Sequence, residues 1–559
     1  MTTKTLCRLA VAGALGLGLH CRGFAAAPSV GADHRLDWWR AARFGLFIHW
    51  GPVSLEGTEI GWSRGGERRG YGSHGTEIPV EVYDNLYRQF NPTNFNAAEW
   101  VAIAQAAGAK YLVFTSRHHD GFSMFDTLAS DYKITSPASP FRRDVVKELA
   151  EACHRAGLRF GVYYSPPDWH NPDAFTERHA QYQAYLKAQV RELMTHYGPV
   201  DILWYDGLGK SAADYDAVNL NRMVRQLQPQ ILINNRSGLP GDFDTPEQVI
   251  GKFQNDRPWE SCITICHQWA WKPGDEMKSL PQCLDTLIRC AGGDGNLLFN
   301  VGPMPDGRIE PRQVERLKEM GRWLAKYGQT IYGTRGGPFK PGTWGASTYR
   351  GKVVYLHVLK WPEDGLELPP IARRIRSAQV LTGGAAAWRQ SAEGISVNVG
   401  KSRRDALDTV IQLRLDGAAA DIVPVAVLSG NSFARGKLAT ASNVFARQDQ
   451  FGAAAAFDGD PETRWATDAG TKTAWLEVDL GKPETFSSVT IDEWAPGGRR
   501  VQSFELQAFE GGKWKTFYRG TTLGPNWEKK VSPVTAQRVR LNILDATEGP
   551  TLNEFGLLP

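Results

Sequence analysis

The chain has 559 residues, of which 42% are hydrophobic and 22% charged, and its formal net charge is +4. This length excludes a single small module, and the composition excludes a disordered or fibrous chain. The balanced charge lacks the dense basic surface of a nucleic-acid-binding protein, so no nucleic-acid partner is expected. The 19 Trp, 17 Tyr and 24 Phe beside 58 Gly suit flat apolar binding faces set among many turns.

Residues 1–26 have the pattern of a secretory signal peptide. Lys4 and Arg8 precede an apolar run from Leu9 to Leu19, and Phe24–Ala27 offers the small residues at which such a segment is cleaved. The run is shorter than the roughly 20 residues that span a bilayer, and no later segment is a candidate for a membrane span. We therefore expect an exported protein, periplasmic or secreted.

Five cysteines remain after removal of the signal peptide: Cys153, Cys262, Cys266, Cys283 and Cys290. The spacing of Cys262, Cys266 and His267 suggests a zinc site, but no second ligand pair follows at the spacing of a zinc finger. Alternation along a strand would turn both sulfurs toward one buried face. Buried free thiols are therefore the preferred interpretation.

Between residues 44 and 334, short apolar runs alternate with helical patterns, which is typical of a parallel sheet built from βα units. The runs are Phe44 to Trp50, Tyr111 to Ser116, Arg159 to Ser165, Asp201 to Asp206, Ile231 to Arg236, Ile263 to Trp269 and Leu297 to Val301. Asn96 and Asp144 each precede a helical pattern and are expected to cap it. Since no dinucleotide fingerprint follows the first run, we predict a (β/α) TIM-like barrel over residues 34–335.

The helical pattern ends after residue 337. Val353–Leu359 and Ile371–Leu381 predict strands, and with them an all-β sandwich over residues 338–432. A second all-β sandwich is predicted over residues 435–559 from runs such as Trp475–Leu480 and Val539–Leu544. The predicted fold class is thus a multidomain protein, a TIM-like barrel followed by two all-β sandwich domains.

Polar and aromatic residues stand where the predicted barrel strands end, on the face that carries function in such barrels. They are His49, His118–Asp120, Tyr164, Trp204–Asp206, Arg236 and, in the following loop, Glu247. Each alone has an ordinary explanation, such as a turn at Asp206 or a hydrogen-bonded core histidine at His49. Their joint placement instead favours one pocket. A metal cluster at His118–Asp120 is less favoured, because adjacent side chains diverge on a strand.

Two carboxylates on such a face with aromatic walls suit glycoside hydrolysis, in which one acts as nucleophile and the other protonates the leaving oxygen. The sequence shows no Ser-His-Asp arrangement on a nucleophile elbow, which would be the best marker of an esterase or a protease.

Five segments taken together resemble the α-L-fucosidases of glycoside hydrolase family twenty-nine, over about residues 35–337. They are Phe44–Gly51, Lys110–Phe122, Gly157–Ser165, Leu203–Gly207 and Gly292–Pro303. The resemblance implies a retaining double displacement with Asp206 as nucleophile and no cofactor for catalysis. It also implies that the fucose ring is held by His49, His118, His119, Tyr164, Trp204 and Arg236, with Glu81 as a weaker match. Trp269 is expected to line the outer pocket.

The acid/base residue has two candidates downstream of Asp206. Glu247 lies in a loop, from which it could reach the leaving oxygen, whereas Glu260 directly precedes a predicted strand and could serve a structural role at the base of the pocket. We favour Glu247 and keep Glu260 as the alternative.

The C-terminal part resembles discoidin-like, coagulation-factor type C sandwiches, which include family thirty-two carbohydrate-binding modules. Phe457–Trp465, Trp475–Gly481 and Leu552–Phe555 carry this resemblance. It implies a structural calcium ion whose ligands would be Asp458, Asp460, Thr463 and Glu554. These oxygen-bearing residues around a tight turn suit a hard cation.

The leading interpretation is an exo-acting α-L-fucosidase that acts on fucosylated oligosaccharides or glycoconjugates. The same chemistry on α-L-galactosides and a non-catalytic glycan-binding protein are the alternatives. Trp259, Trp269 and Trp271 are candidates for an aglycone platform, with core packing as the equal alternative. The sequence leaves the linkage preference and the formation of a homo-oligomer open.

Overall fold

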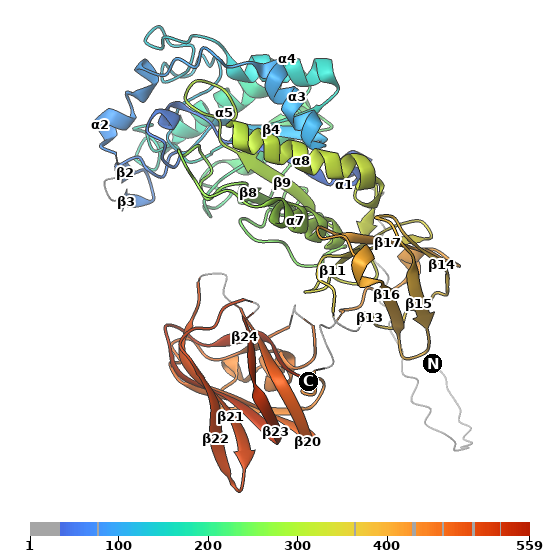
Figure 1. The fold of residues 1–559 in the computed structure, drawn as a ribbon. Coiled ribbons are helices and arrows are strands. Elements are labelled where there is room, and N and C mark those ends of the chain that lie inside the picture. Colours follow the sequence, from blue (N-terminus) through green and yellow to red (C-terminus); the bar gives the residue numbers. More distant parts are fainter. Residues whose placement is uncertain are drawn as a thin grey trace, which may run out of the picture.

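The structure is a computed structural model that describes residues 34–559 except 75–77, 363–364, 428–431, 461–462, 495–497 and 526. The predicted signal peptide, residues 1–26, lies outside the described residues. The first part of the chain forms a parallel sheet with helices around it, and two parts made mainly of antiparallel strands follow (Figure 1). The predicted fold class is confirmed.

Seven parallel strands form the sheet of the first part, in the order β7-β6-β5-β4-β1-β9-β8. They are β1 (Phe44–Ile48), β4 (Tyr111–Arg117), β5 (Arg159–Tyr164), β6 (Ile202–Tyr205), β7 (Leu232–Ile233), β8 (Glu260–Thr264) and β9 (Asn296–Val301). Each corresponds to a predicted run. The run predicted at Ile263–Trp269 is corrected, because β8 begins three residues earlier and ends at Thr264.

An irregular segment joins the two edges of this sheet, β7 and β8. Isolated parallel bridges pair Asn234 with Phe243, Asp244 with Trp259, and Glu247 with Cys262. Backbone hydrogen bonds from Glu260 N to Asp244 O (2.9 Å) and from Gln248 N to Cys262 O (3.0 Å) hold the segment in place. Residues 243–248, which we call the closing segment, therefore take the place of a strand between β7 and β8.

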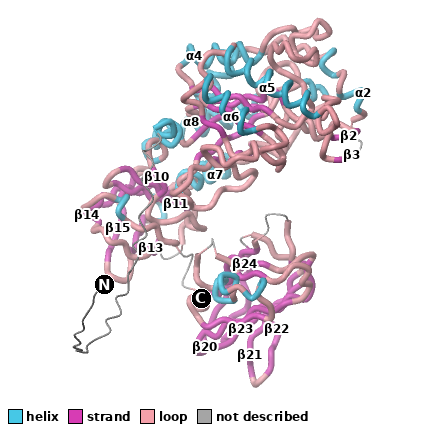
Figure 2. Tube along the Cα trace, turned by 180° about the vertical axis from the view of Figure 1, so that it is seen from behind, coloured by secondary structure: helices cyan, strands magenta, loops and turns pink. Residues whose placement is uncertain are grey.

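The helices are α1 (Asp37–Ala42), α2 (Val80–Tyr83), α3 (Ala97–Ala107), α4 (Val145–Ala156), α5 (His179–Thr195), α6 (Ala217–Leu227), α7 (Leu280–Gly292) and α8 (Pro311–Tyr327). Figure 2 shows the longer ones gathered around the parallel strands. Both predicted caps are confirmed, since the Asn96 side chain accepts from Glu99 N (3.2 Å) and the Asp144 side chain accepts from Lys147 N (2.9 Å). A short hairpin, β2 (Gly66–Arg68) and β3 (Gly72–His74), lies between β1 and α2.

Strand alternation divides the barrel core into an outer and an inner layer. Leu46, Phe114 and Phe160 belong to the outer layer, between the sheet and the helices, whereas Phe47 and Trp204 belong to the inner layer. The inner layer supports the carboxyl ends of the strands from below.

A five-stranded and a three-stranded antiparallel sheet form the middle part, in the orders β10-β11-β12-β17-β14 and β13-β16-β15. Their strands are β10 (Arg335–Gly336), β11 (Gly345–Arg350), β12 (Val353–Val358), β13 (Leu366–Leu368), β14 (Ile375–Val380), β15 (Ala386–Gln390), β16 (Ile395–Val399) and β17 (Thr409–Leu415). Their side chains share a buried cluster that includes Leu356, Val397 and Leu413. Ala346 and Val410 pack into the outer layer of the barrel and join the two parts.

The C-terminal part is an antiparallel sheet in the order β19-β24-β20-β23-β21-β22, with β18 paired to β20. Its strands are β18 (Leu438–Ala441), β19 (Trp465–Ala466), β20 (Ala474–Glu493), β21 (Val501–Glu510), β22 (Lys513–Gly520), β23 (Trp527–Ala546) and β24 (Thr551–Leu558). A separate core that contains Trp465, Phe457 and Phe555 lies within it.

The five cysteines named above are all buried and free, which confirms the preferred interpretation. Among the described residues, no helix is both long and apolar enough to cross a membrane.

Candidate active site

The polar residues at the carboxyl end of the barrel follow inner-layer residues of the same strands. His49 and Asp206 stand just past the ends of β1 and β6, two positions after Phe47 and Trp204 respectively, so each pair points to the same face. His49 lies against Phe47, with ring centroids 4.5 Å apart, and Phe47 lies 5.3 Å from Trp204. The alternation therefore sets these polar side chains on a packed aromatic floor.

Asp206 is the carboxylate at the centre of this group. Its Oδ2 accepts a hydrogen bond from the Tyr163 hydroxyl (3.0 Å) and lies 3.4 Å from Nε2 of His119, while its Oδ1 lies 3.2 Å from Nη1 of Arg236. Burial alone would raise the pKa of Asp206, but the Arg236 guanidinium and the His119 imidazole hold it well below its usual range. Asp206 is thus an ionised carboxylate with fixed orientation.

Arg236 connects Asp206 to Glu247. The same Nη1 that approaches Asp206 donates to Oε2 of Glu247 at 2.7 Å. The face of the guanidinium lies 4.6 Å from the ring of Trp204. The Glu247 side chain is 42% exposed and that of Asp206 only 14%, so Glu247 lies nearer the mouth of the site.

Three buried histidines stand beside Asp206. His49 Nδ1 contacts Asn300 Oδ1 at 2.7 Å, His119 Nδ1 contacts the Ser165 hydroxyl at 2.6 Å, and the ring of His118 stacks on Tyr163. Burial lowers the pKa of His49 to about 3 and that of His118 well below its usual value, and for His118 the neighbouring histidines lower it further. Both rings are therefore neutral at pH 7 and suit hydrogen bonds to uncharged hydroxyl groups.

Tyr163, and not Tyr164, faces the site. Tyr163 belongs to the inner layer and contacts Asp206, whereas the hydroxyl of Tyr164 donates to Gln189 Oε1 (2.9 Å) in the outer layer. Adjacent residues of a strand point to opposite faces, so only one of the two can line the pocket. The structure thus places Tyr163, and not the predicted Tyr164, in the pocket.

Glu81 does not join the group around Asp206. It is exposed on α2, and none of its described contacts reaches the residues at this end of the barrel. Glu59, which sequence reasoning missed, borders the site instead, at the backbone of Trp269. Its carboxylate accepts from the backbone N–H groups of Trp269 (2.9 Å) and Ala270 (3.1 Å), and burial raises its pKa to about 7.

Glu260 lies at the opposite end of β8 from the strand tips. It is fully buried, and its carboxylate accepts from the hydroxyl of Tyr111 and from Nε1 of Trp204 (3.2 Å). Burial raises its pKa to about 7, against the effect of these donors. The Trp204 ring lies between Glu260 and Arg236. Glu260 therefore lies beneath the pocket, where it holds Trp204 in position.

The three tryptophans considered for an aglycone platform lie in different surroundings. Trp269 is half-buried beside His49, with ring centroids 4.8 Å apart, and its backbone N–H is held by Glu59. Trp259 is buried, and its Nε1 donates to Gly293 O (3.2 Å). Trp271 is half-buried. Trp269 thus borders the site, whereas Trp259 serves core packing.

Three of the candidate calcium ligands, Asp458, Asp460 and Thr463, lie at one turn of the C-terminal part, and Glu554 on β24 stands beside them. Asp458 accepts from Asp460 N (2.8 Å) and from the Thr463 hydroxyl (2.7 Å). Burial, and after it the charge of Asp458, raises the pKa of Glu554 to about 8. Within the described ranges, no group of three or more His, Cys, Asp or Glu side chains is placed as a metal cluster.

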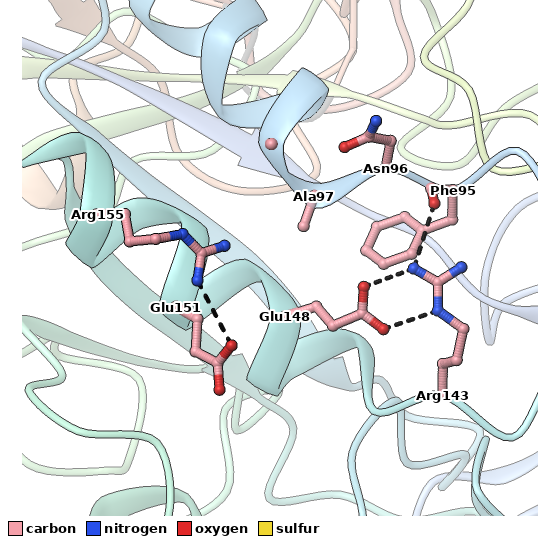
Figure 3. A pocket seen from close by; sticks show the side chains of 8 residues that line it. Phe95, Asn96, Ala97, Arg143, Glu148, Glu151 and Arg155 are labelled. Carbon is pink, nitrogen blue, oxygen red and sulfur yellow. Dashed lines mark hydrogen bonds and ion pairs between the residues drawn. The ribbon is translucent and has the colours of Figure 1, made fainter.

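A hollow on the outside of the barrel lies between the start of α3 and the length of α4 (Figure 3). Its charged groups are already paired: Arg143 donates to Glu148 (2.8 Å), and Arg155 lies 3.6 Å from Glu151. It shares no residue with the group around Asp206, and we assign it no role.

Comparisons with known proteins agree on one family. The family described as alpha-L-fucosidase matches residues 25–329, and the F5/8 type C domain matches residues 438–555. The plasma alpha-L-fucosidase of Rattus norvegicus is 31% identical over 367 residues, which cover 59% of this chain and 78% of that protein.

Solved structures give the same result. Alpha-L-fucosidase isoenzyme 1 from Paenibacillus thiaminolyticus has a TM-score of 0.62 and 34% identity, covering 68% of this chain and 99% of that one. The alpha-L-fucosidase from Vibrio sp. strain EJY3, at 23% identity and a TM-score of 0.64, shares the fold over 94% of both chains. The chain belongs to the alpha-L-fucosidase family.

Proposed function

We propose that this chain removes terminal α-L-fucose from glycans with retention of configuration, through a covalent fucosyl-enzyme on Asp206. Retention is supported by the spacing of the two carboxylates. Asp206 Oδ1 and Glu247 Oε2 lie 3.2 and 2.7 Å from the same nitrogen of Arg236, which brings these oxygens within about 6 Å of each other. Retaining glycosidases hold their carboxyl groups roughly 5–5.5 Å apart, and inverting ones roughly 6.5–9.5 Å.

In the proposed reaction, Asp206 attacks the anomeric carbon while Glu247 donates a proton to the departing glycosidic oxygen. Glu247 then takes a proton from water, which attacks the same carbon and releases Asp206. Asp206 suits the first role because Tyr163, His119 and Arg236 fix its orientation. The greater exposure of Glu247 suits the second role, since the leaving group departs toward solvent.

Recognition of the sugar follows from the neutral histidines and the aromatic floor. His49 and His118 can each donate to or accept from a hydroxyl group without burying a charge. Trp204 and Trp269 offer apolar surface for the faces of the ring that carry C–H groups. A neutral monosaccharide therefore suits this pocket.

The proposed stereochemistry predicts that α-L-fucose is the first product. Hydrolysis of 4-nitrophenyl α-L-fucoside followed by proton NMR should show the α anomer before the β anomer, which appears later by mutarotation. Initial release of the β anomer would contradict the double displacement. No release from this substrate, with release from the corresponding α-L-galactoside, would instead identify the other sugar.

We also propose that the C-terminal part is a carbohydrate-binding module with a structural calcium ion. The donor set is entirely oxygen, and Oε1 of Glu554 is buried without a hydrogen-bond partner among the described residues. Asp458, Asp460, Thr463 and Glu554 would hold the ion. It would balance the carboxylate charges that raise the pKa of Glu554.

Calcium is expected to raise the melting temperature of the protein by several degrees, and more at pH 8 than at pH 5. This pH dependence follows from Glu554. Its pKa is about 8 in the ion-free fold against a usual value of 4.5, so the ion-free fold loses stability as the pH rises between these two values. Differential scanning fluorimetry with calcium or EGTA measures this. Glu554→Gln should lose the calcium response. Glu548→Gln is the control and should keep the calcium response, because it changes a carboxylate outside the proposed site that accepts a hydrogen bond from Gly549 N (2.8 Å).

Export is proposed from the signal pattern in residues 1–26. A mature protein that begins near residue 27, as determined by mass spectrometry, would support export. A mature protein that keeps residues 1–26 would count against it.

A further inference from the structure

Arg236 is fixed by a residue that has no part in the proposed reaction. Its Nε donates to the hydroxyl of Thr245 at 2.8 Å, and its Nη2 donates to the backbone carbonyl of Thr245 at 3.0 Å. Thr245 is 8% exposed and lies in the closing segment. Two of the three guanidinium nitrogens are therefore held by this one threonine.

This attachment decides where the third nitrogen lies. The guanidinium group is planar and rigid, so fixing Nε and Nη2 fixes the direction of Nη1. Nη1 is the atom that lies 3.2 Å from Asp206 and 2.7 Å from Glu247. The position of the positive charge between the two carboxylates thus depends on Thr245.

The hydroxyl of Thr245 is itself oriented by a chain of contacts. It donates to Asn235 Oδ1 (2.9 Å), and Asn235 Nδ2 donates to Asp244 Oδ1 (3.1 Å), which also accepts from Arg257 Nε (2.8 Å). A hydroxyl group has one hydrogen and two acceptor sites. With its hydrogen directed to Asn235, the Thr245 oxygen turns its acceptor side toward Arg236.

We propose that Thr245 is a positioning residue for the reaction, which holds Arg236 so that its charge is shared between Asp206 and Glu247. This inference rests on the proposed function of these two carboxylates. Thr245 touches neither of them and acts through Arg236 alone.

Removal of the hydroxyl group tests the proposal. Thr245→Val keeps the branched shape and is expected to lower kcat/KM on 4-nitrophenyl α-L-fucoside about 10-fold, because a hydrogen bond to a charged group is lost. Thr245→Ser keeps the hydroxyl group and should stay near wild type. Thr286→Val is the matched control, since Thr286 is 7% exposed and its hydroxyl donates to Gln282 O (2.8 Å) on α7, away from the site.

The pH profile separates positioning from packing. A less well-placed Arg236 stabilises the Asp206 carboxylate less, so its pKa rises and the acid limb of kcat/KM moves to higher pH in Thr245→Val. The other titratable groups around Asp206 are Tyr71, Tyr163, His49, His118, His119, Cys262 and, across Arg236, Glu247. Thr286→Val should leave the limb unmoved.

Three results would overturn the proposal. The first is wild-type kcat/KM with an unmoved acid limb in Thr245→Val. The second is an equal loss of kcat/KM in Thr245→Val and Thr245→Ser with an unmoved acid limb, which would indicate that Thr245 contributes only packing. The third is an inactive wild-type protein, which would overturn the proposed function as well. If Thr245→Val does not fold, Thr245→Ala also lacks the hydroxyl group and should show the same shift.

Discussion

Replacing Asp206 with alanine is expected to lower kcat on aryl α-L-fucosides by about four orders of magnitude. Asp206 is the carboxylate that Tyr163, His119 and Arg236 hold ionised and oriented at the end of β6. Without it no covalent intermediate can form, and only binding and acid catalysis remain. Steady-state kinetics on 4-nitrophenyl α-L-fucoside measure the loss.

Azide distinguishes loss of the nucleophile from general damage. In Asp206→Ala the small anion can enter the vacated space and attack directly, so activity should recover and the product should be fucosyl azide of inverted configuration. Asp201→Ala is the matched control. Asp201 lies just before β6, at the end of the strand away from Asp206. Its carboxylate accepts hydrogen bonds from Phe160 N (2.9 Å) and Arg159 Nη1 (2.7 Å), so its loss should lower the stability of the fold and leave kcat nearly unchanged. Fucosyl azide of retained configuration from Asp206→Ala would contradict the assignment.

The sequence located the barrel strands well because each is a short apolar run followed by polar residues. It could not tell which of Tyr163 and Tyr164 faces inward. Strands of a parallel barrel are buried on both faces, so they lack the polar alternation that would reveal the register. The prediction chose Tyr164, and only the packing of Tyr163 in the inner layer corrects it.

Two other features depend on contacts between distant segments. Glu59 follows β1, but the backbone N–H groups that it binds belong to Trp269 and Ala270, about 210 residues away in the chain. The closing segment has no apolar run, and it is held by isolated bridges on either side of Pro246. No local pattern predicts either one, so the signal for both exists only in the folded chain.

The sequence left Glu247 and Glu260 as rival acid/base residues, and their surroundings predict different kinetics. Glu247→Ala should lower kcat by about 10²–10⁴-fold on fucosides with poor leaving groups and much less on those with good ones, because only the former need a proton. Azide should restore turnover of the covalent intermediate and give fucosyl azide of retained configuration. A series of aryl fucosides with leaving groups of different pKa measures the dependence.

Glu260→Gln is the matched comparison, because it keeps the volume of the side chain beneath the pocket. The carboxylate of Glu260 accepts from Tyr111 and Trp204, and the amide of glutamine can satisfy only one of these donors with its oxygen. A buried donor left unpaired costs about 1–3 kcal/mol, so the melting temperature should fall. The loss of kcat should be similar for good and poor leaving groups, since Trp204 shifts under Arg236 in every case. If Glu260→Gln shows the leaving-group dependence and azide rescue while Glu247→Ala shows neither, the proton comes from Glu260 and the assignment of Glu247 is wrong.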